Sequence, residues 1–176
     1  MPTNSPSGDS TVNEALFQRA VHVTIQNEGG DAVTSDATGG LTKYGWALNE
    51  NPGLTRDAIL NMTEAQAIDR YRDKFWTPYR WAELPDAVAV KAFDIAVNAG
   101  PFSSVQCLQR ALRACGKRVL DDGALGTLTV TAAFDVPADA LLAALKSEVA
   151  GHYRMVGVSK PQLSGAITGL LNRAYA

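Results

Sequence analysis

Residues 28–45 read EGGDAVTSDATGGLTKYG, and this stretch decides the fold together with the segment before it. Upstream, apolar side chains recur at helical spacing, and Thr11 with Glu14 forms a capping box. The pattern predicts a helix that begins at Thr11 and ends at Gly29-Gly30, because glycine readily adopts the left-handed conformation that terminates helices. The polar, glycine-bearing residues 31–40 predict a loop or a short irregular hairpin.

Further helical segments fill the rest of the chain. Thr63 and Gln66 form a second capping box, and Gly100-Pro101 separate two more helices. Residues 41–48 are expected to enter a helix, whereas residues 125–134 fit a strand by propensity and a short helix by context. Alternating strand patterns are nearly absent, so we predict a mainly α fold with a small β-hairpin after the first helix.

Composition sets the class of protein. The chain has 176 residues, of which 46% are hydrophobic and 19% are charged, with a net charge of −2. These values predict a globular protein without the bulk basic surface that nucleic acid requires. No run approaches the ~18 apolar residues of a membrane span, and the polar start lacks the apolar centre of a signal peptide. We therefore expect synthesis in a cytosol and no stable membrane insertion.

Several common catalytic sites are missing from the sequence. There is no GxxxxGK[ST] phosphate loop, no GxGxxG and no HExxH motif, and the only histidines, His22 and His152, are far apart. The sequence therefore predicts neither a cofactor nor a metal.

What remains is a group of carboxylates around the two glycine pairs. Glu28 falls at the predicted end of the first helix, where the helix dipole disfavours its charged form, as suits a general acid. Asp36 and Thr42 follow and can position water, which is the arrangement that hydrolysis of a glycosidic bond requires. The alternatives are a frayed helix end for Glu28, a turn-forming residue for Asp36 and a helix cap for Thr42.

A set of short motifs favours the catalytic interpretation over these alternatives. Glu28-Gly29-Gly30 and residues 39–45 resemble the N-terminal signature of glycoside hydrolase family 108, the phage and prophage N-acetylmuramidases. Further segments match in order over residues 14–175: Phe75-Trp76 with Pro78, Phe93-Asp94 with Asn98-Ala99-Gly100, and Leu108 to Leu112 with Asp122-Gly123, Gly126 and Thr129. The last group resembles the peptidoglycan-binding region of the family.

The resemblance implies a lysozyme-like endolysin that cleaves the β-1,4 bond between N-acetylmuramic acid and N-acetylglucosamine. It implies that Glu28 is the catalytic acid. The family's second aspartate would fall at position 37, where this chain has Ala37, so Asp36 is expected to supply that carboxylate or to be a turn residue. Tyr44 is a candidate for stacking on a sugar ring.

Asp94 and Asn98 are four residues apart, so they share one face of a helix. They are interpreted either as substrate-binding groups lining the cleft or as a buried hydrogen-bonded pair.

The expected organisation is a tail at 1–10, a catalytic half at 11–100 and a helical peptidoglycan-binding half at 101–176 packed into the same globule. The resemblance implies synthesis in a bacterial cytoplasm and action on the cell wall after release. The expected partner is the glycan strand of peptidoglycan, and the oligomeric state is open. Two other functions remain: a lytic transglycosylase, and an inactive wall-binding or secretion module. The muramidase hypothesis requires that Glu28 lie in a groove, hold a proton and not be locked in an ion pair with a buried arginine.

Overall fold

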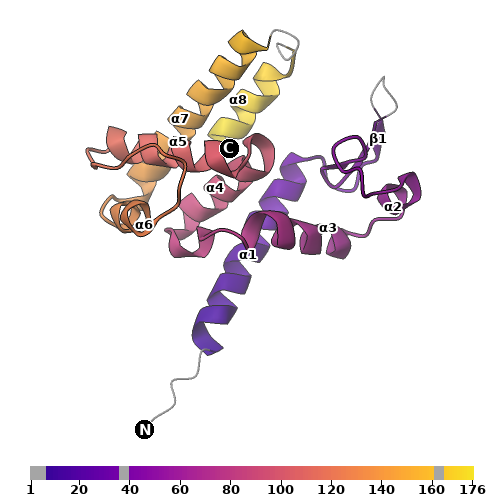
Figure 1. Ribbon diagram of the computed structural model, residues 1–176, viewed down its shortest axis with the longest axis horizontal. Coiled ribbons are helices and arrows are strands. Elements are labelled where there is room, and N and C mark those ends of the chain that lie inside the picture. The colour runs from indigo at the N-terminus through magenta and orange to yellow at the C-terminus, as the bar shows by residue number, and fades with distance from the viewer. Residues whose placement is uncertain (1–6, 36–39, 161–164) are drawn as a thin grey trace.

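The first helix joins the two ends of the molecule. The computed structural model describes residues 7–35, 40–160 and 165–176, and within them α1 (Ser7–Asn27) runs from the helical body to a small sheet (Figure 1). The helix begins at Ser7, so the predicted start at Thr11 and the predicted tail to residue 10 are wrong. Serine and aspartate, which favour helix starts, also occur at positions 7, 9 and 10, so the local signal does not select a single start.

The end of α1 lies where the two glycines predict it. The Gly30 N–H donates to the carbonyl of Ile25 at 2.9 Å, and the Gly29 N–H donates to that of Gln26 at 3.1 Å. This is the Schellman arrangement, and it needs the left-handed φ of +92° that Gly29 adopts. Glu28 is therefore the C-cap residue of α1, held at a defined point between helix and loop.

A three-stranded antiparallel sheet follows, in the order β1 (Thr34–Ser35), β2 (Leu41–Lys43) and β3 (Trp46–Ala47). Thr42 pairs with Thr34 on one side and with Ala47 on the other. The predicted hairpin is confirmed, and the helix expected over residues 41–48 is wrong. Tyr44 and Gly45 have φ of +50° and +77°, which makes a tight two-residue turn that joins β2 to β3.

Short helices connect the sheet to the core. They are α2 (Arg56–Leu60), α3 (Glu64–Tyr71), the π-helical turn η1 (Arg72–Trp76) and the 3₁₀ turn η2 (Trp81–Glu83). The capping box of Thr63 and Gln66 is confirmed. Arg72 donates to both carboxylate oxygens of Glu14 at 2.7 Å, and Trp76 Nε1 donates to Asn13 at 2.9 Å. These contacts fasten η1 against α1.

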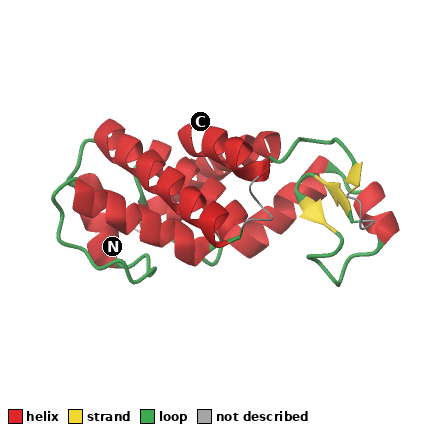
Figure 2. Cartoon of the chain, turned by 90° about the horizontal axis from the view of Figure 1, so that it is seen from above, coloured by secondary structure: helices red, strands yellow, loops and turns green. Residues whose placement is uncertain are grey.

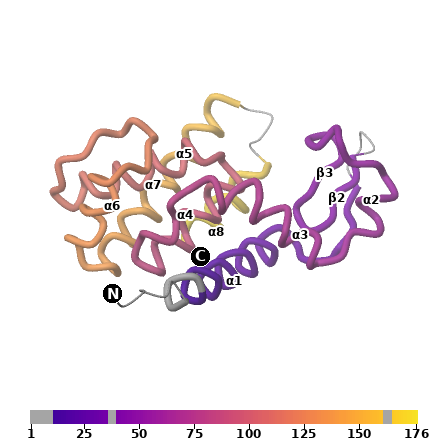
Figure 3. The backbone as a smooth tube through the Cα atoms, turned by 60° about the horizontal axis from the view of Figure 1, so that its bottom comes forward, coloured from indigo at the N-terminus to yellow at the C-terminus, as the bar shows by residue number. Residues whose placement is uncertain are grey.

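The helical body is built around α4 (Asp86–Ala99), which is buried along most of its length. It is followed by α5 (Pro101–Ala114), α6 (Thr127–Phe134), α7 (Ala138–Ser159) and α8 (Ile167–Tyr175). Residues 125–134 therefore contain a helix and no strand. α4 packs on α1, α5 and α7, and α8 lies along α7 (Figures 1 and 3).

One hydrophobic cluster runs from Leu16 to Ala174, through both halves of the chain. The strands gather at one end, apart from most of the helices (Figure 2). None of the helices in the described part of the chain is long and apolar enough to cross a membrane.

Candidate active site

The tip of the β2–β3 hairpin lies against the side chain of Glu28. The Tyr44 N–H donates to the carbonyl of Gly30 at 3.2 Å, and the hydroxyl of Tyr71 donates to the carbonyl of Tyr44 at 2.9 Å. A Cβ atom at Gly45 would lie 2.8 Å from Glu28 Cγ and would also collide with the Tyr71 hydroxyl. Only glycine at position 45 lets the hairpin pack this closely, so the sheet positions the Glu28 side chain from one side.

On the opposite side, Glu28 forms an ion pair with an arginine from the C-terminal helix. Arg173 Nη1 donates to Glu28 Oε1 at 2.5 Å, and the two side chains are 10% and 22% exposed. This is a short, charge-assisted hydrogen bond between two mostly buried side chains. The expectation that Glu28 is not paired with a buried arginine is therefore wrong.

Asp94 holds Arg173 in place. Its Oδ1 accepts from Arg173 Nη2 at 2.8 Å and its Oδ2 accepts from Nε at 3.2 Å, which is the two-pronged geometry that arginine and carboxylate favour. Asn27 Nδ2 donates to Asp94 Oδ1 at 3.0 Å, and Lys91 Nζ lies 4.0 Å from Oδ2 and donates to the carbonyl of Arg173. The Lys91, Asp94, Arg173 and Glu28 side chains, here called the charged cluster, have no net charge when all four are ionised.

The surroundings of the charged cluster shift the pKa values of Arg173, Lys91 and the neighbouring Tyr71. Burial opposes the charged form of Arg173, but Asp94 and Glu28 outweigh it and raise the pKa of the guanidinium. Burial lowers the pKa of Lys91, with Asp94 acting in the opposite sense. Burial, followed by the negative charge of Glu28, raises the pKa of the Tyr71 hydroxyl. Tyr71 and Arg173 therefore stay protonated around neutral pH and can act as hydrogen-bond donors to their partners.

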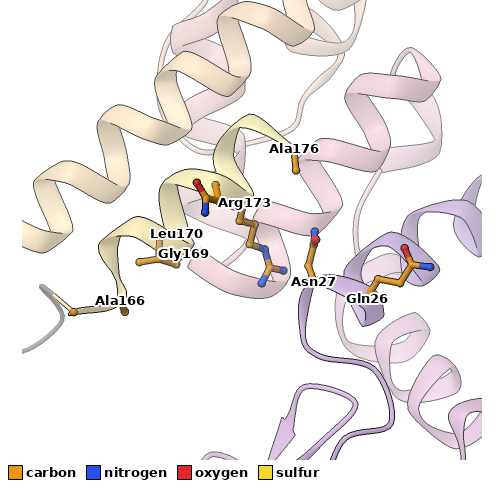
Figure 4. A pocket seen from close by; sticks show the side chains of 9 residues that line it. Gln26, Asn27, Ala166, Gly169, Leu170, Arg173 and Ala176 are labelled. Carbon is orange, nitrogen blue, oxygen red and sulfur yellow. The ribbon is translucent and has the colours of Figure 1, made fainter.

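A cavity of about 660 Å³ opens beside this cluster (Figure 4). Gln26 and Asn27 from α1 line it together with Gly169, Leu170 and Arg173 from α8. Figure 4 shows the Arg173 side chain reaching from α8 toward Asn27, the residue that precedes Glu28. The cavity is large enough for sugar rings, and its wall includes Asn27, which precedes Glu28, and Arg173, which contacts it, while Glu28 itself is not among the lining residues.

The other predicted site residues are placed differently. Asp36 lies outside the described residues. Thr42 is half-buried in the central strand, and Tyr44 is half-buried at the hairpin tip beside Glu28. Asp94 is only 1% exposed and is bound by protein groups, so the geometry favours support of Arg173 over direct contact with substrate.

Within the described residues, Asn98 makes no hydrogen bond or ion pair with the charged cluster, although it shares a helix face with Asp94 and binds Tyr153, which interacts electrostatically with Arg173, Asp94 and Glu28. It is exposed, and its Oδ1 accepts from the Tyr153 hydroxyl at 2.9 Å. Burial raises the pKa of Tyr153 to about 12, so the hydroxyl stays a donor. Asn98 and Tyr153 line a second cavity of about 500 Å³ with His152 and Lys160.

Arg173 is the residue that sequence reasoning missed. It is 145 residues from Glu28 and 79 from Asp94, and α8 carries no motif that sets this arginine apart. An arginine on an otherwise apolar helix face would have been the only signal. Among the described residues, no group of three or more histidine, cysteine, aspartate or glutamate side chains could hold a metal ion.

The motif compared with a peptidoglycan-binding region has an internal role. Gln109 is 1% exposed, and its Nε2 donates to Asp122 Oδ1 at 2.8 Å, to the Ala124 carbonyl at 3.0 Å and to Thr129 Oγ1 at 3.3 Å. Its Oε1 accepts from the Gly123 N–H at 2.9 Å. The motif residues thus fasten the Asp-Gly turn to α5.

A family model and a solved structure are similar to this chain. The family model described as glycosyl hydrolase 108 matches residues 21–100, which contain Glu28, the hairpin and α4. The chain is therefore a glycoside hydrolase, and the resemblance seen in the motifs is confirmed over this segment. The fold is similar to that of Brucella abortus SagA, with a TM-score of 0.66 and 23% identity over 92% of this chain and 95% of that one. The predicted mainly α, lysozyme-like fold is confirmed. No curated protein matches significantly.

Proposed function

Residues 21–100 belong to the glycosyl hydrolase 108 family, and from this premise we propose that the chain hydrolyses the glycan strands of peptidoglycan. The proposed bond is the β-1,4 linkage between N-acetylmuramic acid and N-acetylglucosamine, and the proposed place of action is the bacterial cell wall, as expected of an endolysin. One observation carries the proposal: Glu28 is held at the helix end in contact with both the hairpin tip and Arg173, and Asn27 and Arg173 beside it line a sugar-sized cavity.

In the proposed reaction, Glu28 transfers a proton to the bridging oxygen as the glycosidic bond breaks. A water molecule adds to the anomeric carbon, and its proton passes to a carboxylate or to solvent, so that one water is consumed for each bond. Glu28 has to carry a proton in this step, so the reacting arrangement differs from the ion pair with Arg173 that the structure shows.

The partner that positions water is proposed to be Asp36 with Thr42. The positions of the two residues support this proposal. Thr42 belongs to β2, whose end forms the hairpin tip beside Glu28, and Asp36 directly follows β1 in the chain. The half-buried Tyr44 at that tip is proposed to contact a sugar ring, since its aromatic face suits the apolar face of a pyranose.

The test is the substitution Glu28→Gln, assayed on purified sacculi. Glutamine keeps the size of the side chain and its hydrogen-bond acceptor for Arg173, but it cannot donate a carboxylic proton. We expect release of reducing sugar to fall by a factor of about 10² or more, in line with the contribution of a general acid. The melting temperature should stay close to that of the parent. Glu50→Gln, at an exposed position, is the matched control.

A folded Glu28→Gln variant with undiminished release would refute the assignment. Mass spectrometry of the products tests the reaction type, because a hydrolase adds water and a lytic transglycosylase leaves an anhydro sugar. Binding to sacculi by the parent protein without any bond cleavage would instead identify an accessory module.

A further inference from the structure

A second cavity adjoins the first along α8. Its volume is about 500 Å³, and it shares two lining residues, Ala166 and Leu170, with the cavity beside Glu28. Figure 4 shows both residues on α8, in the wall of the first cavity. The proposed reaction takes place beside the first cavity and assigns no part to the second.

Hydrogen-bonding side chains from three helices line the second cavity. Asn98 comes from α4, Ser103 from α5 and His152 from α7, and Lys160 is the C-cap residue of α7. Most of the remaining wall is apolar, and it consists of Ala99, Val156, Ala166 and Leu170. An apolar wall with a few polar groups that converge on it is typical of sites for small ligands.

The polar groups of this cavity are available to a ligand. Asn98 Oδ1 accepts from the Tyr153 hydroxyl at 2.9 Å, whereas its Nδ2 donates to no group in residues 7–35, 40–160 and 165–176. Within the same residues, the Lys160 ammonium and the Ser103 hydroxyl have no hydrogen-bond or ion-pair partner. Burial lowers the pKa of His152, so its imidazole is neutral near pH 7, with one donor and one acceptor nitrogen.

The charge of the lining indicates the class of ligand. Lys160 is a cation at neutral pH, and no aspartate or glutamate is among the described residues that line the cavity. Burial raises the pKa of the lining Tyr153 to about 12, so that this hydroxyl stays neutral. The cavity therefore suits a ligand that combines a carboxylate with amide groups and short apolar side chains.

A peptide branch of the proposed substrate has this chemistry. In peptidoglycan, N-acetylmuramic acid carries a short peptide on its lactyl group, and this peptide has backbone amides and free carboxylates. We propose that the second cavity binds this peptide while the glycan strand occupies the first cavity. The inference rests on the proposed function, because it requires a muramic acid residue beside Glu28.

The position of the second cavity supports this assignment. Tyr153, in its wall, interacts electrostatically with Arg173, Asp94 and Glu28, so the wall lies close to the charged cluster. Asn98 lies about one helical turn after Asp94 on α4. A branch that leaves the glycan beside Glu28 can therefore follow α8, past Leu170 and Ala166, into the second cavity.

The experiment compares two probes by titration calorimetry with the unmodified protein. Both contain the disaccharide in which N-acetylglucosamine is linked to N-acetylmuramic acid, and one of them also carries a tetrapeptide on the lactyl group. Neither probe contains the bond proposed to be cleaved. We expect the peptide-bearing probe to bind about tenfold more tightly, which is the effect of one hydrogen bond to a charged group.

Two variants test the residues that would bind the peptide. Lys160→Met keeps the apolar stem and removes the charge, so the tenfold preference should fall towards one. Asn98→Asp keeps an acceptor for the Tyr153 hydroxyl but adds a negative charge to the cavity, so it should also reduce the preference. Arg154→Met removes an exposed cation of α7 that does not line the cavity, and it should keep the preference of the parent.

The outcomes separate this inference from the proposed function. If the parent cleaves sacculi but binds the two probes alike, the peptide site is refuted and the role of Glu28 stands. A preference that folded Lys160→Met and Asn98→Asp both retain also refutes the site. If Lys160→Met weakens both probes equally, the cavity holds sugar and the peptide assignment is wrong. If the parent binds neither probe and releases no reducing sugar, both proposals fail.

Discussion

At the scale of single residues, Gly45 is the position where conformation and close packing coincide. Its φ of +77° is disfavoured for residues with a side chain, and its missing Cβ leaves space for Glu28 and for the Tyr71 hydroxyl. The preceding Tyr44 adopts a left-handed conformation despite its side chain. The turn therefore carries backbone strain next to the proposed catalytic group, as functional sites often do.

The first prediction concerns this glycine. Gly45→Ala should destabilise the protein by about 1–3 kcal/mol, because the new methyl group collides with Glu28 and the backbone conformation becomes strained. Activity should fall even in the folded fraction, since Glu28 must shift. Chemical denaturation and a cleavage assay measure the two effects.

Gly53→Ala is the matched control, because a Cβ atom there would have no neighbour within 4 Å. Gly53→Ala should leave both the free energy of unfolding and the cleavage activity nearly unchanged. If Gly45→Ala also left both unchanged, the inference that the hairpin tip packs closely against Glu28 would be refuted.

At the scale of elements, hydrogen bonds from a single buried side chain hold the loop between α5 and α6. Gln109 forms hydrogen bonds with groups in the Asp-Gly turn and with Thr129 at the start of α6. Its segment was interpreted from the motif as part of a wall-binding region, but these contacts use the polar atoms of Gln109 inside the protein. The motif thus has a structural explanation whether or not the region binds glycan.

The second prediction follows from this network. Gln109→Leu should reduce the free energy of unfolding by about 1–3 kcal/mol, because the Gly123 N–H and the neighbouring acceptors lose a buried partner. Binding of the folded variant to sacculi should be unchanged. Thermal unfolding and a pull-down with sacculi test the two statements.

Gln106→Leu on the same helix is the control for this substitution. Gln106 makes one hydrogen bond, to the Asp121 carbonyl at 2.9 Å, so its loss should be milder. Loss of sacculus binding by folded Gln109→Leu would show that the side chain serves the ligand and not the loop.

At the scale of the whole molecule, the last helix completes a site that begins with the first. Lys146 of α7 donates to the carbonyls of Tyr175 and Ala176, at 3.0 and 2.8 Å, and Lys91 of α4 donates to that of Arg173. Two lysines from two helices therefore bind the end of α8, where the helix dipole is negative. These contacts keep Arg173 against Glu28.

The third prediction tests this docking. Lys146→Met should increase hydrogen exchange in residues 167–175 while α4 stays protected, because local opening depends on the contacts that hold an element. Arg154→Met, an exposed substitution on the same helix, should leave the exchange unchanged. Faster exchange throughout the chain, and not only in α8, would contradict a local role for Lys146.

Much of this protein could be predicted from local sequence. The two glycines that end α1, the capping box at Thr63 and the placement of Glu28 at a helix end all follow from rules that act within a few residues. For residues 31–40 the sequence predicts a loop or a hairpin without choosing between them, and the helix that it predicts over residues 41–48 is instead β2 and β3. The Tyr44-Gly45 turn depends on a left-handed tyrosine, which local propensity does not favour.

The sequence by itself determined a mainly helical fold, the position of the proposed acid and the family of the segment around it. Only the tertiary structure decided what surrounds that acid. Glu28 meets Arg173 across 145 residues and Gly45 across a hairpin, and Asp94 faces Arg173 instead of the solvent. Helix periodicity and caps depend on near neighbours, whereas the charge state of a carboxyl depends on every group that packing brings to it, however distant in the chain.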